Sequence, residues 1–233
     1  MLLKGEGIVL KSIKYGEKSQ ICSVFTKEYG VLSVIHNRII NKKRRDPNYF
    51  QALSHIEFIC YPSKNSELHR IKEVQFKVAS NSIEASVVKN ALKFFLAEVL
   101  EKIIREKEQN NALFLFIAER VTELNSTKES LGSFHLEFMI GLLNHLGIIP
   151  QIAPNDHYFD LIEGISTDTK PLRNKFISGK TFEQFQKIFE NQRDLGKLER
   201  NNVLNILLEY IDIQLNTSLN QLKTKAVLEV IFE

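Results

Sequence analysis

The sequence predicts two regions of different class, an all-β region followed by an all-α region, within its 233 residues. Up to about residue 78, β-branched and partly alternating runs are separated by glycine turns, as in β-hairpins. Beyond about residue 80, apolar residues recur every three to four positions, as in amphipathic helices. Residues 1–78 hold 14 Lys/Arg and 7 Asp/Glu, whereas residues 79–233 hold 17 Lys/Arg and 21 Asp/Glu. We therefore expect one domain at 1–79 and another at 80–233, with a polyanionic partner for the first.

The first region contains five runs with strand character. Gly16 and Gly30 lie in the tight turns that follow the first two runs, and we expect Gly16 to adopt a positive φ. A polar, basic loop of residues 37–48 separates the third run from the fourth. The expected strands are residues 7–14, 19–26, 31–36, 53–61 and 68–78. Five short strands with one long connection fit a small closed barrel, and an SH3-like barrel fits the pattern nearly as well.

The second region has helical periodicity with recognisable ends. Asn81 and Glu84 form a candidate capping box at the start of the first helix. Gly147 and Pro150 mark the end of the third helix. Residues 150–180 are expected to be an irregular insertion, and the tail at 222–232 fits either a last helix or a strand. The expected helices are residues 84–104, 111–124 and 128–146, a short one opening at 181, and 199–216.

Composition excludes several classes of protein. No apolar run approaches the roughly 18 residues that a membrane helix needs. The N-terminus lacks the charged and apolar segments of a signal peptide. Cys22 and Cys60 lie in strand-like runs, where we expect buried free thiols. We therefore expect a cytoplasmic, nucleoid-associated protein that has no membrane partner.

Three segments near the N-terminus carry a resemblance to a known family: residues 7–10 (GIVL), 15–17 (YGE) and 25–30 (FTKEYG). In order along the chain they resemble the opening of the RecO family of recombination mediators. The similarity continues at residues 50–53, 68–71, 142–150 and 222–228. It implies that the barrel is an OB-fold, followed by an all-α C-terminal domain.

The resemblance also implies a function in DNA repair and homologous recombination, within the RecF pathway. A RecO-type protein binds single- and double-stranded DNA and anneals complementary strands. It acts with RecR to load RecA onto single strands coated by single-strand-binding protein, whose C-terminal tail is a further partner. An alternative from another class stays open, namely a protein–protein adaptor whose barrel does not touch nucleic acid.

The candidate DNA contacts are cations and aromatic side chains of the first region. Cations release counterions from phosphates, and aromatic rings stack on exposed bases. The loop after the third strand contains Arg38, Lys42, Lys43, Arg44 and Arg45. The first and fifth strands add Lys11, Lys14, Arg70 and Lys72. The candidates for base stacking are Tyr15, Tyr29, Phe50 and Tyr61. Each type also has a plain structural interpretation, as a solvated loop, outward-facing strand residues, or aromatics of the barrel rim and core.

The sequence departs from many RecO proteins because residues 147–200 contain no cysteine. Zinc prefers four Cys or His ligands at short spacings, and His145, Asp156, His157 and Asp160 make a thin set. We therefore expect no zinc and no other cofactor, and residues 151–177 must hold their shape by packing and hydrogen bonds.

Enzyme classes find little support in the sequence. Asp156, Asp160, Glu163 and Asp168 are the candidate carboxylates of a metal-dependent nuclease, but no His or Lys accompanies them at a recognised spacing. Phosphate-binding glycine motifs and the nucleophile elbow are absent from the sequence. We expect a protein that is not an enzyme. For the tail of single-strand-binding protein, a helix stripe including Phe134, Phe138 and Leu142 is a candidate groove, although plain core is the favoured interpretation.

Overall fold

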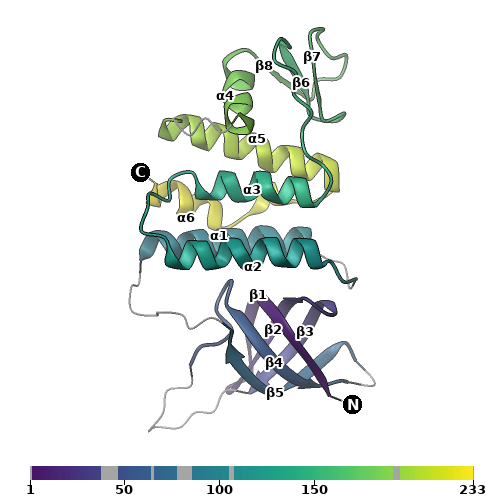
Figure 1. Ribbon diagram of the computed structural model, residues 1–233, viewed down its shortest axis with the longest axis vertical. Helices are drawn as coiled ribbons and strands as arrows, with labels where there is room; N and C mark the ends of the chain where they lie inside the picture. Colours follow the sequence, from purple (N-terminus) through teal and green to yellow (C-terminus); the bar gives the residue numbers. More distant parts are fainter. Residues whose placement is uncertain are drawn as a thin grey trace. The chain divides into compact units, whose positions relative to one another are not determined.

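A computed structural model describes residues 2–37, 47–63, 66–77, 86–104, 108–190 and 195–232 (Figure 1). The contacts within the chain define two compact units, Met1–Lys128 and Glu129–Glu233. The first unit contains the predicted β region and two helices, and the second contains further helices and three short strands. The predicted boundary at residue 79 lies within residues 78–85, outside the described part, and stays a prediction.

Five strands of the first unit form a closed barrel. The strands are β1 (Leu3–Tyr15), β2 (Ser19–Thr26), β3 (Gly30–Asn37), β4 (His55–Tyr61) and β5 (Leu68–Phe76). Their order around the barrel is β1-β2-β3-β5-β4, and β1 closes it by pairing with both β2 and β4. The β3–β5 pair is parallel, whereas the other pairs are antiparallel. The five predicted strands are confirmed, and the barrel is consistent with an OB-fold.

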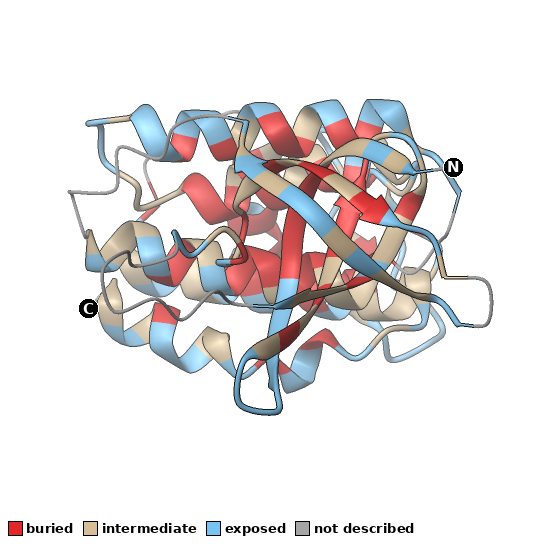
Figure 2. Ribbon diagram, turned by 90° about the horizontal axis from the view of Figure 1, so that it is seen from below, coloured by how far each residue is buried: buried red, intermediate tan, exposed pale blue. Residues whose placement is uncertain are grey.

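Alternate residues of the strands fill the barrel interior, as the two-residue period of a strand requires. Figure 2 shows buried and exposed positions along the same strands. Cys22 and Cys60 are both buried free thiols in this core, as predicted. Gly7 stands where a side chain would collide with Val24 Cγ1, so the close approach of β1 and β2 requires glycine there. The buried core cluster consists of Val9, Cys22, Val24, Val34, Phe50, Ile56, Phe58 and Cys60.

Glycines shape the two tight turns of the barrel. Gly16 and Gly30 have φ values of 66° and 65°, a region that side chains with a Cβ rarely occupy. The positive φ predicted for Gly16 is confirmed. In the second turn the buried Thr26 hydroxyl donates to the Gly30 carbonyl at 2.8 Å and accepts from the Tyr29 amide at 2.9 Å. These contacts satisfy the hydroxyl inside the protein and hold the turn in place.

Two helices complete the first unit: α1 (Val87–Ile103) and α2 (Asn111–Ser126). The N-cap of α1 is Ser86, whose hydroxyl accepts from the Lys89 amide at 3.3 Å. The predicted start at residue 84 is therefore three residues early, and Asn81 and Glu84 lie outside the described residues. Ile8 and Phe25 face away from the barrel interior yet are buried, and the Phe114 ring of α2 lies 5.8 Å from that of Phe25.

The three helices predicted for the second unit are present in the predicted order, with shifts in their ends. The third predicted helix begins later than expected, at Phe134, and ends where Gly147 takes a φ of 71°. The tail, which the sequence left open, is helical. The described elements are α3 (Phe134–His145), α4 (Gly179–Phe189), α5 (Lys197–Leu215), η1 (Leu219–Gln221) and α6 (Thr224–Ile231).

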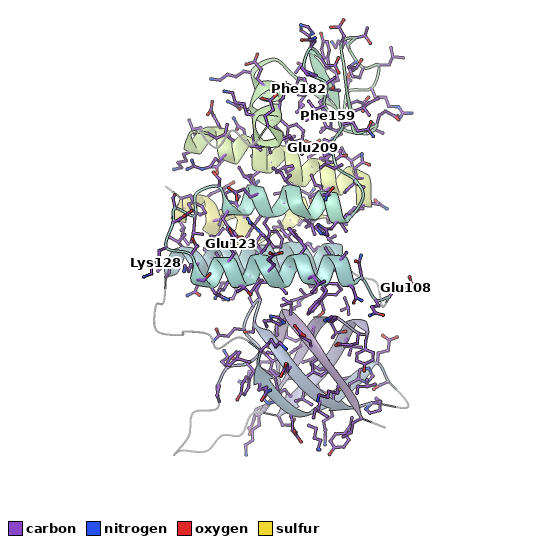
Figure 3. All side chains as sticks on the ribbon, viewed as in Figure 1. Glu108, Glu123, Lys128, Phe159, Phe182 and Glu209 are labelled. Carbon is purple, nitrogen blue, oxygen red and sulfur yellow. The ribbon has the colours of Figure 1, made fainter. Side chains whose placement is uncertain are left out.

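The second region is not all-α, because residues 150–180 contain a three-stranded antiparallel sheet. Its strands, β6 (Tyr158–Asp160), β7 (Ile165–Thr167) and β8 (Phe176–Ser178), have three residues each, too few to give a periodic signal in the sequence. Phe159 anchors the sheet, with its ring 5.1 Å from that of Phe185 and 5.7 Å from that of Tyr210. Figure 3 labels Phe159 and Phe182, whose rings are stacked.

Hydrogen bonds to α5 complete the attachment of this segment. The Tyr210 hydroxyl donates to the Ile148 carbonyl at 2.8 Å, and Gln214 Nε2 donates to the carbonyls of Leu161 and Ile162 at 2.9 Å. The segment is thus held by packing and hydrogen bonds, as expected for a chain without the cysteine cluster.

Candidate nucleic-acid interface

One rung of cross-strand partners crosses the outer surface of the barrel. The register pairs Ile13 of β1 with Ile21 of β2, and Ile21 with Ile35 of β3. Ile35 is next to Arg70 of β5, which is next to Tyr61 of β4. Ile13 and Tyr61 are 51% and 48% exposed, and Arg70 is also exposed. The rung therefore presents apolar, cationic and aromatic side chains next to one another on the outside of the barrel.

The neighbouring rungs extend this surface along the strands. Lys11 pairs with Ser23 and precedes Ile13 by two residues on β1. Because side chains alternate along a strand, Lys11 and Ile13 lie on the same side of the sheet. Tyr15 pairs with Ser19 on the other side of the rung, and this tyrosine is 57% exposed. Ser19 in turn pairs with Asn37, the last residue of β3. We call this surface the outer face, defined by Lys11, Ile13, Tyr15, Ile21, Ile35, Tyr61 and Arg70.

The five loop cations Arg38, Lys42, Lys43, Arg44 and Arg45 lie outside the described residues. The described chain stops at Asn37 and resumes at Pro47. Because β3 runs parallel to β5 with Ile35 beside Arg70, the end of β3 lies next to the stretch that contains Arg70 and Lys72. The basic segment of the sequence therefore follows directly on the part of the barrel that carries two other predicted cations.

The strand cations differ in their partners. Lys11 Nζ lies 2.8 Å from Glu101 Oε1 of α1, and Lys72 Nζ lies 3.0 Å from Glu73 Oε1. The hydrogen bond and charge of Glu73 raise the pKa of Lys72, which keeps that amine charged. Lys14 and Arg70 are exposed and have no ion pair within the described ranges. The last two thus have their full charge available for a phosphate.

The four aromatic candidates are not equivalent. Tyr15 and Tyr61 are exposed on the outer face, whereas the Tyr29 hydroxyl donates to the Lys4 carbonyl at 3.2 Å. Phe50 is only 2% exposed, and its ring lies 5.0 Å from that of His36 within the barrel core. Burial leaves Phe50 no ring surface for a base, because it supplies the hydrophobic core instead. We therefore remove Phe50 from the candidates for stacking.

Sequence reasoning missed the three isoleucines of the outer face. Their outward orientation can be read from the sequence, since Ile13, Ile21 and Ile35 alternate with inward-facing residues. Alternation shows which side chains share a face of one strand, but it does not show which residues of neighbouring strands are paired. The register of the folded barrel is what aligns these isoleucines with Arg70 and Tyr61.

The candidate nuclease carboxylates serve structural contacts. Asp160 Oδ1 accepts from the amides of Ile162 and Glu163 at 2.8 and 3.1 Å, and Asp156 accepts from the Ser166 hydroxyl. The described ranges contain no group of three or more His, Cys, Asp or Glu side chains able to hold a metal ion. Asp168 lies 2.9 Å from His157 in an exposed pair. No carboxylate centre for metal-dependent cleavage is assembled among these described residues.

The stripe of α3 considered for a peptide tail is core. Phe134, Phe138 and Leu142 are all buried within the second unit. This agrees with the favoured interpretation of the sequence. Among the described helices, none is long and apolar enough to cross a membrane.

The fold and this surface define a class: a small closed barrel with a cationic and aromatic outer face, followed by a helical region. Two family models match the chain, recombination protein O N-terminal over residues 1–78 and recombination protein O C-terminal over residues 85–154. The chain belongs to the RecO family.

Curated relatives cover the whole chain. The DNA repair protein RecO of Bacteroides fragilis is 31% identical over 100% of both chains. The DNA repair protein RecO of Flavobacterium psychrophilum is 28% identical, and that of Porphyromonas gingivalis 26%, each also over 100% of both chains. The similarity therefore includes the segment with the small sheet, which the two family models leave unmatched beyond residue 154.

Proposed function

We propose that this protein is a DNA-repair and recombination mediator that binds single- and double-stranded DNA and anneals complementary strands. In this proposal it acts with RecR to load RecA onto strands coated by single-strand-binding protein, and it binds the C-terminal tail of that protein. Membership of the RecO family supports the whole proposal, including these partners. The rung that aligns Ile35, Arg70 and Tyr61 supports the DNA-binding part.

The outer face has the two properties that a single strand requires. Arg70 supplies positive charge for phosphates on this face, and Lys14 and Lys72 add positive charge from other positions of β1 and β5. The exposed side chains of Tyr15 and Tyr61 supply flat surfaces for bases. Ile13 adds an exposed apolar side chain at the β1 end of the same rung. None of these contacts distinguishes one base from another, so we expect binding that is independent of sequence.

Annealing needs no bond chemistry from the protein. Cations on the outer face and in residues 38–46 reduce repulsion between two strands, because each neutralised phosphate lowers the electrostatic cost of bringing the strands together. Stacking on two exposed tyrosines keeps bases accessible, and such contacts are weak enough to yield when base pairing begins. The protein therefore acts by holding strands in a form that is ready to pair.

The test is fluorescence anisotropy of a labelled single strand of mixed sequence across a salt series. One variant changes Arg38, Lys42, Lys43, Arg44 and Arg45 to alanine. Loss of five phosphate contacts should flatten the plot of log K against log salt by about 3 to 4 units. A second variant, Tyr15→Ala with Tyr61→Ala, should weaken binding while it leaves the slope nearly unchanged, because stacking releases few counterions.

A control variant removes five exposed cations from the second unit: Lys170, Arg173, Lys180, Lys187 and Lys223. If the control flattens the slope as much as the loop variant does, the barrel is not the site of DNA binding. If the wild-type protein fails to bind the strand at low salt, the adaptor alternative gains support. The exposed Ile13 beside Ile21 and Ile35 would then serve a protein partner.

A further inference from the structure

A second candidate site lies within the first unit, away from the outer face. A cavity of about 180 Å³ is lined by the segment before β4, the end of β5, and one face each of α1 and α2. For comparison, an engineered apolar cavity of about 150 Å³ admits benzene, so this one has room for a single planar ring. Its volume exceeds by far what one water molecule occupies.

A half-buried lysine lines this cavity. Lys93 of α1 has no hydrogen bond or ion pair within the described ranges. Burial, together with the charge of Lys89, lowers the pKa of Lys93. A cation that is partly removed from water and unpaired is costly, and an anion beside it would offset that cost. The lysine therefore indicates a ligand with negative charge.

A buried histidine forms part of the cavity wall. The His55 side chain is 10% exposed, and its Nε2 lies 2.7 Å from Glu6 Oε1. Because a carboxylate only accepts, Nε2 carries the hydrogen, and burial lowers the pKa of His55, which keeps the ring neutral. Nδ1 is then a lone-pair acceptor, and it is buried without a hydrogen-bond partner in the described structure. Since Nδ1 has almost no accessible surface, it is shielded from the cavity as well as from bulk solvent, and the histidine contributes only ring surface to the wall.

The backbone beside the cavity is held in an unusual conformation. Leu53, which lines the cavity, has a φ of 57°, a value that residues other than glycine seldom adopt. Its amide donates to the Val9 carbonyl at 2.8 Å, which ties this conformation to the barrel. Strain of this kind persists only when the surrounding structure imposes it, and it clusters at ligand-binding sites. Phe76 forms an aromatic wall of the same cavity.

We propose that this cavity binds one nucleotide, with the phosphate on Lys93 and the base against Phe76. A nucleoside monophosphate supplies both the anion and a planar ring that fits against Phe76. The side-chain amides of Gln51 and Asn125 at the cavity offer further donors and acceptors to a base edge. The ligand is either a free mononucleotide or an unstacked nucleotide of a DNA strand, and the second source rests on the proposed DNA-binding function.

The experiment is isothermal titration calorimetry of the full chain with each of the four deoxynucleoside 5′-monophosphates and with inorganic phosphate. At least one mononucleotide should bind more tightly than inorganic phosphate. Lys93→Met should weaken that binding by about tenfold or more, as expected for loss of a charge-assisted hydrogen bond. Thr122→Trp, at the exposed edge of the cavity, should block it without removing a core side chain.

Lys102→Met is the matched control, since Lys102 is on the same helix and does not line the cavity. Thermal unfolding of all variants verifies that they are folded. The proposal is overturned if no mononucleotide binds, if inorganic phosphate binds equally well, or if Lys93→Met and Thr122→Trp both bind as the wild type does. Binding of an acidic peptide with a free C-terminus, without binding of any mononucleotide, would overturn it in favour of a peptide site.

Binding of an oligonucleotide that carries 2-aminopurine at one end or in the middle distinguishes a free mononucleotide from a nucleotide of a strand as the ligand. If a strand enters the cavity, the bound mononucleotide should compete with it, and Lys93→Met should weaken both ligands. If only the free nucleotide binds there, Lys93→Met should leave strand affinity unchanged. Both results support the cavity site. Wild-type protein that binds a mononucleotide but no strand would contradict the proposed DNA-binding function and leave the cavity site standing.

Discussion

Thr26 and His135 are polar residues buried in the first and second unit respectively, and they are accommodated in different ways. The Thr26 hydroxyl both donates and accepts within its own turn. His135 of α3 packs its ring at 5.5 Å from that of Phe232. Burial, with a smaller contribution from Arg200, lowers the pKa of His135 to about 3. The imidazole is therefore neutral in the folded protein at ordinary pH.

His135 should make stability depend on pH. Its pKa is about 3 in the folded chain against 6.5 for an unperturbed histidine, so the unfolded chain binds more protons between these values. The free energy of unfolding should therefore fall as pH decreases below about 6.5, by up to about 1.4 kcal/mol per pH unit. We expect urea unfolding between about pH 7 and pH 5 to reveal this slope.

His135→Phe provides the comparison, because it removes the titrating group and keeps a ring beside Phe232. The difference in slope between the two proteins isolates His135 from other titrating groups, including His55, whose pKa burial also lowers. Equal slopes in the wild type and the variant would show that His135 does not titrate with the depressed pKa.

The starts of the helices offer a test at the scale of elements. Ser86 caps α1 through a side-chain hydrogen bond to the Lys89 amide, whereas Ser133 at the start of α3 has no such bond. Ser86→Ala should therefore lower the free energy of unfolding by about 1 kcal/mol, and Ser133→Ala should have a much smaller effect. Thermal or urea unfolding of the two variants measures the difference. Equal losses would mean that the Ser86 hydroxyl does not act as a cap.

The predictability of an element depended on its length. Strand β2 and helix α5 repeat their pattern often enough to be located within a few residues. The three-residue strands β6, β7 and β8 are too short to repeat an alternating pattern. The small sheet is held because Phe159 and the hydrogen bonds from Gln214 attach it to helices distant in the chain. The tail could not be assigned because eight residues of α6 carry a short pattern that a strand also fits.

At the scale of the whole molecule, the first unit joins the barrel to a helix through Phe114. Its ring lies 5.8 Å from that of Phe25 on β2 and 6.0 Å from that of His55 on β4. Phe114→Ala should destabilise the protein by about 3 to 5 kcal/mol, because a large cavity would remain. Hydrogen exchange should become faster in the amides of both α2 and β2, since one side chain supports both elements.

Phe138→Ala is the control for this prediction, because Phe138 is equally buried but belongs to the second unit. It should destabilise α3 and its neighbours and leave local exchange in β2 unchanged. Faster exchange confined to α2 in Phe114→Ala would mean that the barrel does not depend on the helix.

The candidate site was only partly readable from the sequence. Arg70 and Tyr61 were proposed as separate candidates, and the register shows that they are direct neighbours. Phe50 was a stacking candidate because it follows the basic loop, yet its side chain enters the core. Proximity in sequence says nothing about which way a loop residue points. The cavity beside Lys93 could not be anticipated at all, since its walls come from four separate segments.

The change from strands to helices, the turn glycines, the buried thiols and the family were all readable from the sequence alone. These properties are local, because periodicity, turn conformation and motif spacing involve residues close together in the chain. The strand register, the small sheet, the burial of Phe50 and the position of Lys93 at a cavity became known from the folded structure. Each of these depends on contacts between segments distant in the chain, which are selected by how well the complete set of side chains packs and pairs its polar groups.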